Sequence, residues 1–137
     1  MKKHNLILAS TAKEVGVIEP IDYAIFQDHG YRGLYGGLTS KDIHKRKNLK
    51  PSQKILDHMG TTELAANLFR ATQTEEKLKS EKLSIKSKKE ANLIHEEVGK
   101  KVRKAIRDIG GTLPENLPKE ESIKKIESKI KRLKNKN

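Results

Sequence analysis

Hydrophobic residues recur every three or four positions over much of this chain, which is the period of amphipathic α-helices. Residues 90–111 give the clearest case, because their apolar positions fall within about 40° of one line at a helical 100° per residue. These positions are Ala91, Ile94, Val98, Val102, Ala105 and Ile109, and Gly110 and Gly111 follow as a stop. Nothing alternates with period two long enough to be a strand. We therefore predict an all-α fold: a small bundle of short helices plus two longer amphipathic helices at the C-terminus.

The other helices are placed by residues that start or stop a helix. The predicted spans are 2–15 before Gly16, 21–29 between Pro20 and Gly30, 41–47 after Thr39 or Ser40, 52–59 after Pro51, and 63–82 after Thr61 or Thr62. Residues 119–134 form the last predicted helix, and they carry Ile123, Ile126, Ile130 and Leu133 at steps of 3, 4 and 3. This stripe is too short to establish a coiled coil, but it needs a surface to pack against.

Residues 30–38 are predicted to be a compact loop rich in glycine and tyrosine, because four glycines within eight residues oppose a helix. We favour a loop whose tyrosine rings pack on the core, with hydroxyls and Arg32 free to face a partner. It lacks the spacing of a phosphate-binding loop and follows no strand. We expect residues 1–85 to form one compact helical region. Residues 86–137 then add a long helix, a proline turn and a last helix to the same structural unit.

Charge narrows the choice of partner. The chain of 137 residues has 30 Lys and Arg against 18 Asp and Glu, a net charge of +12. The excess is uneven: segments 23–60, 86–109 and 110–137 each carry +4, whereas 1–22 and 61–85 are neutral. A positive field of this size favours polyanionic partners, although lysines interleaved with glutamates also serve solubility alone.

The same composition argues against several other classes of function. There is no cysteine, and no pair of the five histidines has the spacing of a helical zinc site, so we expect no metal and no cofactor. No residues carry the signature of an activated nucleophile, and we expect no enzymatic activity. No apolar run approaches the ~20 residues of a membrane span. A cytoplasmic protein is expected.

Two clusters of basic residues are the candidate contacts with nucleic acid or a protein partner. They are Arg32, Lys45, Arg46, Lys47 and Lys50 in the first, and Arg103, Lys104 and Arg107 in the second. Residues 39–70 also have the outline of a helix-turn-helix, in which a helix beginning near Pro51 would point Ser52, Gln53 and Lys54 towards a DNA groove. Whether these residues pack as a true helix-turn-helix stays open at this stage.

Several strings in this chain resemble a known family. They are DYAIFQDHGYRGLYGGL with KDIHKRK, SQKILDHMGTTELAANLFRATQTEEKL, EVGKKVRKAI and GGTLPENLP, and together they resemble the C-terminal half of the DNA-damage-inducible protein D (DinD) family over about residues 1–127. The resemblance implies a bacterial protein of the damage response that damps the RecA-type recombinase filament on single-stranded DNA. It supplies no catalytic residues.

One departure from the family concerns the N-terminus. Members usually begin with a module resembling the DNA-binding BRO-N domain, and this sequence lacks it, so the chain is either a fragment or a complete short variant. The leading hypothesis is a non-enzymatic module that acts on the recombinase filament through protein contacts, DNA contacts or both. The alternatives are a direct DNA binder of helix-turn-helix type, and the oligomerisation half of a larger DNA-binding protein. The expected partners are the recombinase, DNA or both, and a second copy of the chain in a homodimer is a further candidate.

Overall fold

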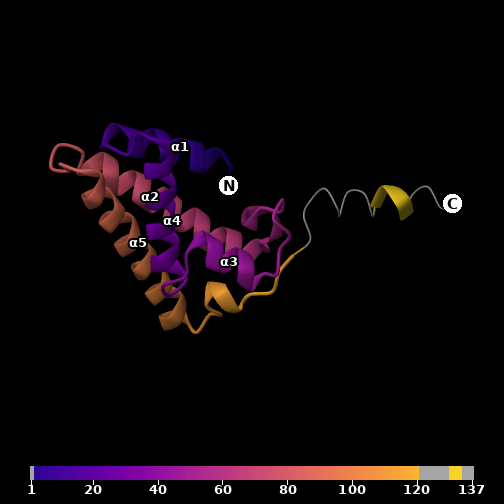
Figure 1. Cartoon of the computed structure of the whole chain (residues 1–137). Helices are drawn as coiled ribbons and strands as arrows, with labels where there is room; N and C mark the ends of the chain where they lie inside the picture. Colours follow the sequence, from indigo (N-terminus) through magenta and orange to yellow (C-terminus); the bar gives the residue numbers. More distant parts are fainter. Residues whose placement is uncertain (1, 121–129, 134–137) are drawn as a thin grey trace.

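The computed structural model describes residues 2–120 and 130–133, and within them the fold is all-α, as predicted (Figure 1). Between residues 2 and 120, five α-helices and two short 3-10 helices follow one another. They are α1 (Lys2–Glu14), α2 (Pro20–Leu34), α3 (Ser40–Arg46), η1 (Ile55–His58), α4 (Thr61–Ser80), α5 (Lys88–Ile109) and η2 (Pro114–Asn116). None of these helices is long and apolar enough to cross a membrane.

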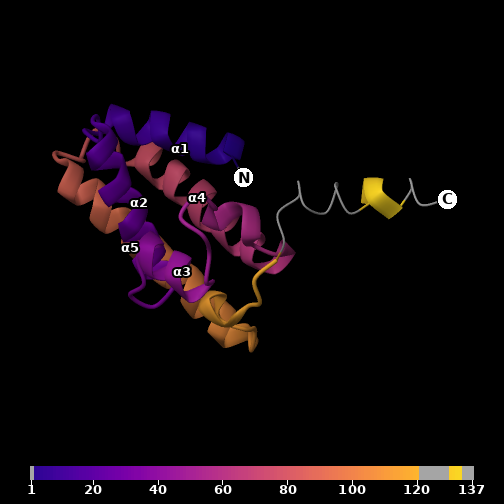
Figure 2. The same cartoon turned by 45° about the vertical axis from the view of Figure 1, so that its right-hand side comes forward.

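The closest helix pairing is that of α2 with α5, which lie side by side in both views (Figures 1 and 2). Glycines make this approach possible. A Cβ atom on Gly33 would lie 2.2 Å from the backbone oxygen of Glu96, and one on Gly99 would lie 2.8 Å from the backbone oxygen of Gly30. Both distances are far below van der Waals contact, so any side chain here would push the two helices apart.

The prediction of a loop over residues 30–38 is wrong for its first half, because α2 continues through Gly30 and Gly33 to Leu34. Each glycine in a helix costs about 1 kcal/mol of stability relative to alanine, but the helix packing that these glycines permit outweighs that cost. The turn begins only at Tyr35. There Gly36 and Gly37 have φ angles of 65° and 102°, a conformation that favours glycine. Tyr31, Leu34 and Tyr35 are buried, as the packed reading of this stretch predicted.

The predicted helix over residues 52–59 is also wrong. Residues 51–54 form a turn without helix, and only the 3-10 helix η1 follows it. The turn has its own hydrogen bonds: the Gln53 side chain accepts from the Lys50 N–H at 2.8 Å, and the His44 ring bonds the Lys50 and Gln53 carbonyls at 3.0 Å. Local side-chain bonds of this kind compete with a helix. Residues 39–70 therefore lack the second helix that a helix-turn-helix needs to enter a DNA groove.

The other helix boundaries agree with the sequence to within one or two residues. Thr39 caps α3 and exchanges hydrogen bonds with Asp42, and Ser87 caps α5 through the N–H of Glu90. Helix α5 ends at Gly110 with φ 86°. Only part of the last predicted helix can be compared with the structure. Ile123 and Ile126 lie outside the described residues, and residues 130–133 form a helical turn.

Two hydrophobic clusters fill the interior, and each takes residues from both sides of residue 85. The first joins Leu8 and Ala12 of α1 to Phe26 of α2, Leu78 of α4 and Ala91 of α5. The second lies around Tyr31, Leu34, Tyr35, Ile43, Met59, Val98 and Val102. Of the six stripe residues on α5, Ala91, Val98 and Val102 are buried, while Ile109 at the free end is 84% exposed.

Between the clusters the core face of α4 is polar. Its buried residues include Glu63, Asn67, Arg70 and Thr74, at helical steps of 4, 3 and 4. Arg70 is fully buried and donates to Nε2 of His95 at 2.5 Å and to Oδ1 of Asn67 at 3.3 Å. Its guanidinium carbon lies 5.1 Å from the centre of the Tyr31 ring, a cation–π contact.

His95 of α5 is neutral in this arrangement. Its Nδ1–H donates to the Phe26 carbonyl at 2.8 Å, which leaves Nε2 unprotonated to accept from Arg70. Burial and then the charge of Arg70 place the His95 pKa well below its ordinary value, while the bond to Phe26 works the other way. His29 on α2 lowers the His95 pKa slightly further.

Replacing Gly33 with alanine should destabilise the fold by about 2–4 kcal/mol, because the new Cβ meets backbone rather than a side chain that could move. Urea unfolding measures the loss. Gly111→Ala is the matched control: there a Cβ meets the Cγ2 methyl of Ile106 at 3.2 Å, and a much smaller change is expected. Equal effects of the two substitutions would contradict the close α2–α5 approach.

The neutral His95 should make stability depend on pH. The unfolded chain binds a proton at His95 below about pH 6.5 and the folded chain does not, so stability falls as the pH drops below that value. Between about pH 7.5 and 5.5 this residue should remove about 1.4 kcal/mol from the free energy of unfolding. His95→Gln keeps one donor and one acceptor, and it should show a shallower fall with pH in urea titrations. Parallel pH profiles would exclude this role for His95.

Candidate partner-binding surface

The eight predicted contact residues fall on three parts of the fold. Arg32 lies in the last turn of α2, and Lys45, Arg46, Lys47 and Lys50 lie at the end of α3 and just after it. The remaining three, Arg103, Lys104 and Arg107, lie in the second half of α5. Their hydrogen bonds and ion pairs divide them into residues that hold the fold together and residues that remain available.

Arg103 holds the fold together. Its guanidinium forms two parallel bonds of 2.8 Å with the Glu115 carboxylate in η2, and it also donates to the Leu34 carbonyl at 3.2 Å. The turn at Gly36 lies directly against it, since a Cβ there would be 2.8 Å from the Arg103 Cζ. Arg103 thus joins α5, the end of α2 and η2. Its bond to Glu115 raises the pKa of the guanidinium further.

Arg46 reaches the same short helix from α3. Its Nε donates to the Glu115 carbonyl at 2.7 Å and its Nη2 to Oδ1 of Asn116 at 2.9 Å. Partial burial of Glu115 opposes ionisation, but the bonds from Arg103 and the nearby charge of Arg46 hold its carboxyl pKa below the usual value. The two basic clusters therefore meet at η2, where Arg46 and Arg103 both have partners from the chain itself.

Lys47 is drawn into the interior. Its ammonium lies 2.7 Å from Oε1 of Glu63, and the two side chains are only 7% and 1% exposed. The other Glu63 oxygen accepts from the Tyr35 hydroxyl at 2.5 Å, and Asn67 in turn donates to that hydroxyl. Burial and the Glu63 carboxylate raise the pKa of the Tyr35 hydroxyl, so it stays protonated as the donor. Lys47 is thus a structural residue.

Four of the eight side chains make no hydrogen bond or ion pair with any residue in 2–120 or 130–133: Arg32, Lys45, Lys50 and Arg107. All four are exposed. Lys104 is exposed too, but it pairs with Asp108 one turn away at 2.9 Å. A surface pair of this type contributes little and is easily exchanged for another partner.

Three of the four available residues surround α3, and we call Arg32, Lys45 and Lys50 the α3 basic surface. Arg32 and Lys45 both lie near the Asp42 carboxylate, whose pKa is lowered first by its bonds to Thr39 and then by these two charges. Lys50 lies four residues after the end of α3, and its carbonyl is held by His44 of that helix. These three side chains are exposed and have no ion-pair partner in residues 2–120 or 130–133, so their positive charge favours anionic groups.

Sequence reasoning missed the buried polar residues Glu63, Asn67, Arg70 and His95. One signal was available: the apolar residues of 63–82 form no continuous stripe, whereas Asn67, Arg70, Thr74 and Leu78 follow a helical spacing. Among the described ranges, no group of three or more acidic or histidine side chains is placed to hold a metal ion.

The structural role of Arg103 can be separated from that of Arg107 on the same helix. Arg103→Gln removes the paired bonds to Glu115 and should lower the free energy of unfolding by about 1–3 kcal/mol. Arg107→Gln, the matched control, should change it by less than about 0.5 kcal/mol, as a surface substitution does. Thermal or urea unfolding of both variants provides the comparison. A stable Arg103→Gln protein would mean that Arg103 is available for partners after all.

Comparison with known proteins identifies the family that this sequence is similar to. Residues 1–126 match the DinD C-terminal domain family. The DNA damage-inducible protein D of Escherichia coli (strain K12) is 58% identical over 132 residues. That alignment covers 96% of this chain and 47% of the relative, so the chain spans about half of the relative's length. No solved structure matches the chain.

Proposed function

This chain belongs to the DinD C-terminal domain family, as its motifs predict, and we propose that it is a non-enzymatic module of the DNA-damage response. In this proposal it modulates the RecA-type recombinase filament on single-stranded DNA, in the cytoplasm. The α3 basic surface makes the contact, with DNA phosphates or with acidic side chains of the recombinase. The observation that carries the proposal is that Arg32, Lys45 and Lys50 are exposed and have no partner among the described residues.

The electrostatics of the molecule support this role. A recombinase filament on single-stranded DNA is a dense polyanion, and exposed guanidinium and ammonium groups bind phosphates by releasing condensed counterions. Several other cations of this chain already have acidic partners, including Lys47, Lys88 and Arg103. The cations without such partners are therefore a better guide to binding than the net charge.

Binding rather than catalysis also agrees with the way the fold uses its titratable groups. Glu63 is neutralised by Lys47 and accepts from Tyr35, and His95 is held between Arg70 and the Phe26 carbonyl. Each of these groups is buried and has its hydrogen-bonding partners inside the protein. Groups engaged in this way hold helices together and are poorly placed to meet a substrate.

Charge reversal of the α3 basic surface should separate DNA contact from protein contact. We expect Arg32→Glu, Lys45→Glu and Lys50→Glu together to reduce the effect of the protein on strand exchange by the recombinase. If the surface binds single-stranded DNA directly, the slope of log affinity against log salt should also fall by about 2, at about 0.7 per phosphate contact. If it binds the recombinase instead, the effect on strand exchange should fall with no change in DNA affinity.

The matched control reverses three exposed lysines of α1, Lys2→Glu, Lys3→Glu and Lys13→Glu, and so changes the net charge equally. It should retain most of the activity. Equal loss in both variants would show that only overall charge matters and would reject the α3 basic surface. If the unmodified chain has no effect on strand exchange at stoichiometric excess, the functional proposal itself is wrong.

A further inference from the structure

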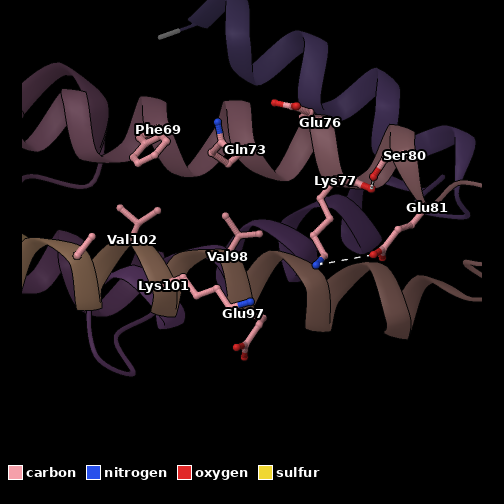
Figure 3. Close-up of a pocket in the computed structure, with 11 residues that line it drawn as sticks. Phe69, Gln73, Glu76, Lys77, Ser80, Glu81, Glu97, Val98, Lys101 and Val102 are labelled. Carbon is pink, nitrogen blue, oxygen red and sulfur yellow. Dashed lines mark hydrogen bonds and ion pairs between the residues drawn. The ribbon is translucent and has the colours of Figure 1, made fainter.

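An open groove runs between α4 and α5, on a part of the molecule that the proposed function does not use. Figure 3 shows Phe69 of α4 facing Val102 of α5 across the groove, with Gln73 facing Val98 beside them. The groove has a volume of about 500 Å³. Phe69 is 50% exposed, and the burial of an aromatic ring is more favourable than that of most other side chains. This surface would therefore gain stability from being covered.

The charged residues that line the groove are of both signs. They are Glu76, Glu81 and Glu97 with Lys77 and Lys101, three negative charges against two positive, a net charge of −1. Lys77 and Glu81 lie 3.7 Å apart and neutralise each other, as the dashed line in Figure 3 marks. The groove is thus close to neutral in a chain whose net charge is +12.

This balance argues against a strongly charged occupant. A polyanion such as DNA would meet three glutamates, and a strongly basic segment would meet two lysines. A second copy of the chain, in contrast, brings the same mixture of signs and the same apolar residues. Two copies with a net charge of +12 repel each other, and the repulsion is small where the facing surfaces are close to neutral.

Glu97 and Lys101 make the surface self-complementary. They lie one turn apart on α5, and both are exposed. Neither forms an ion pair with any residue in 2–120 or 130–133, whereas Glu96 and Lys100, one position earlier on the helix, pair at 3.6 Å. A carboxylate and an ammonium group placed in this way can each meet the opposite charge on an antiparallel copy of the same helix.

We propose that the α4–α5 groove is an interface between two copies of this chain, related by a two-fold axis that sets their α5 helices antiparallel. With the axis midway between Val98 and Val102, Val98 of each copy faces Val102 of the other. Glu97 of one copy then lies within about 3 Å, measured along the helix, of Lys101 of the other, a distance that a lysine side chain can span. The Phe69 ring, which faces Val102 in its own chain, comes to the Val98 end of the other groove.

The remaining charges fit this arrangement without new partners. Lys77 and Glu81 keep their own ion pair, and exposed Glu76 stays in water at the rim. A contact limited to the groove and its rim is small compared with that of an obligate dimer. Association should therefore be reversible and depend on the concentration of the chain.

Sedimentation equilibrium of the full chain should show a shift from monomer to dimer over a range of roughly 1–500 μM. Phe69→Asp places a charge in the apolar part of the interface and should raise the dissociation constant by about tenfold or more. Leu93→Asp is the matched control. Leu93 is 61% exposed on α5, but it lines a separate hollow with Ile25 of α2, so association should be unchanged.

Two charge reversals test the pairing of Glu97 with Lys101 directly. Glu97→Lys and Lys101→Glu should each weaken association, because like charges then meet across the two-fold axis. A mixture of the two variants should associate again, since two lysines of one copy then face two glutamates of the other. Net charge alone predicts a different pattern: Lys101→Glu lowers the repulsion between copies and would strengthen association.

A chain that stays monomeric over the whole concentration range overturns the proposal. So does a dimer that Phe69→Asp and Leu93→Asp weaken equally, or one that responds to the charge variants only through net charge, because its interface lies elsewhere. Circular dichroism and urea unfolding check that each variant is folded. If Phe69→Asp is not folded, the charge variants decide, since Glu97 and Lys101 are exposed.

The interface and the proposed function can be rejected separately. Sedimentation needs neither DNA nor the recombinase, and the groove variants leave Arg32, Lys45 and Lys50 unchanged. Conversely, loss of activity in the charge-reversed α3 basic surface would reject nothing about the groove.

Discussion

The close approach of α2 and α5 is the constraint on which the rest of the fold depends. Gly33 and Gly99 bring the two backbones so near that a single Cβ on either would collide with main-chain atoms of the opposite helix. Gly30 has the same role towards a side chain, since a Cβ there would lie within 2.2 Å of Nε2 of His95. The glycines thus set both the spacing of the helices and the space in which His95 sits.

His95 in turn determines how a cation can be buried in the core. Arg70 is fully buried and forms no ion pair with a carboxylate in residues 2–120 or 130–133, an arrangement that is costly unless its N–H groups and its charge are otherwise satisfied. The neutral His95 ring, the Asn67 carbonyl oxygen and the face of Tyr31 supply that environment, although Nε of Arg70 has no partner among the described residues.

The polar contacts continue beyond Arg70. Asn67 also bonds Tyr35, and Tyr35 bonds Glu63, so the contacts reach from α5 to Lys47 at the end of α3. Such a chain of bonds fixes the orientation of α4 more specifically than apolar packing alone.

These contacts also explain how far the sequence could be interpreted. The apolar stripe of α5, the Thr39 and Asp42 capping box and the stop at Gly110 are local signals, and the predictions made from them are confirmed. Gly30 and Gly33 led to an incorrect loop because their value lies in contact with α5, about 65 residues later in the chain, which no local propensity records. The roles of Lys47 and Arg103 could not be predicted for the same reason: Glu63 and Glu115 become their partners only when α3, α4 and η2 are assembled. The candidate contacts at the end of α2 and around α3 stay a prediction, and the structure adds that Arg32, Lys45 and Lys50 are exposed there.

Knowing these partners separates the basic side chains that hold the fold together from those that remain exposed. Arg46 and Arg103 both donate hydrogen bonds to residues of η2. They thus hold in place the segment that leads to Glu120, whose carbonyl bonds the His58 ring. Two arginines that the sequence offered as contacts for nucleic acid or a protein partner therefore hold η2 against α3 and α5. At the α3 basic surface, by contrast, Arg32 and Lys45 lie near the Asp42 carboxylate, which is already hydrogen-bonded to Thr39. Because Asp42 is engaged in this way, it offsets the charge of Arg32 and Lys45 only in part, and their remaining positive charge is the physical basis on which the α3 basic surface would attract a polyanion.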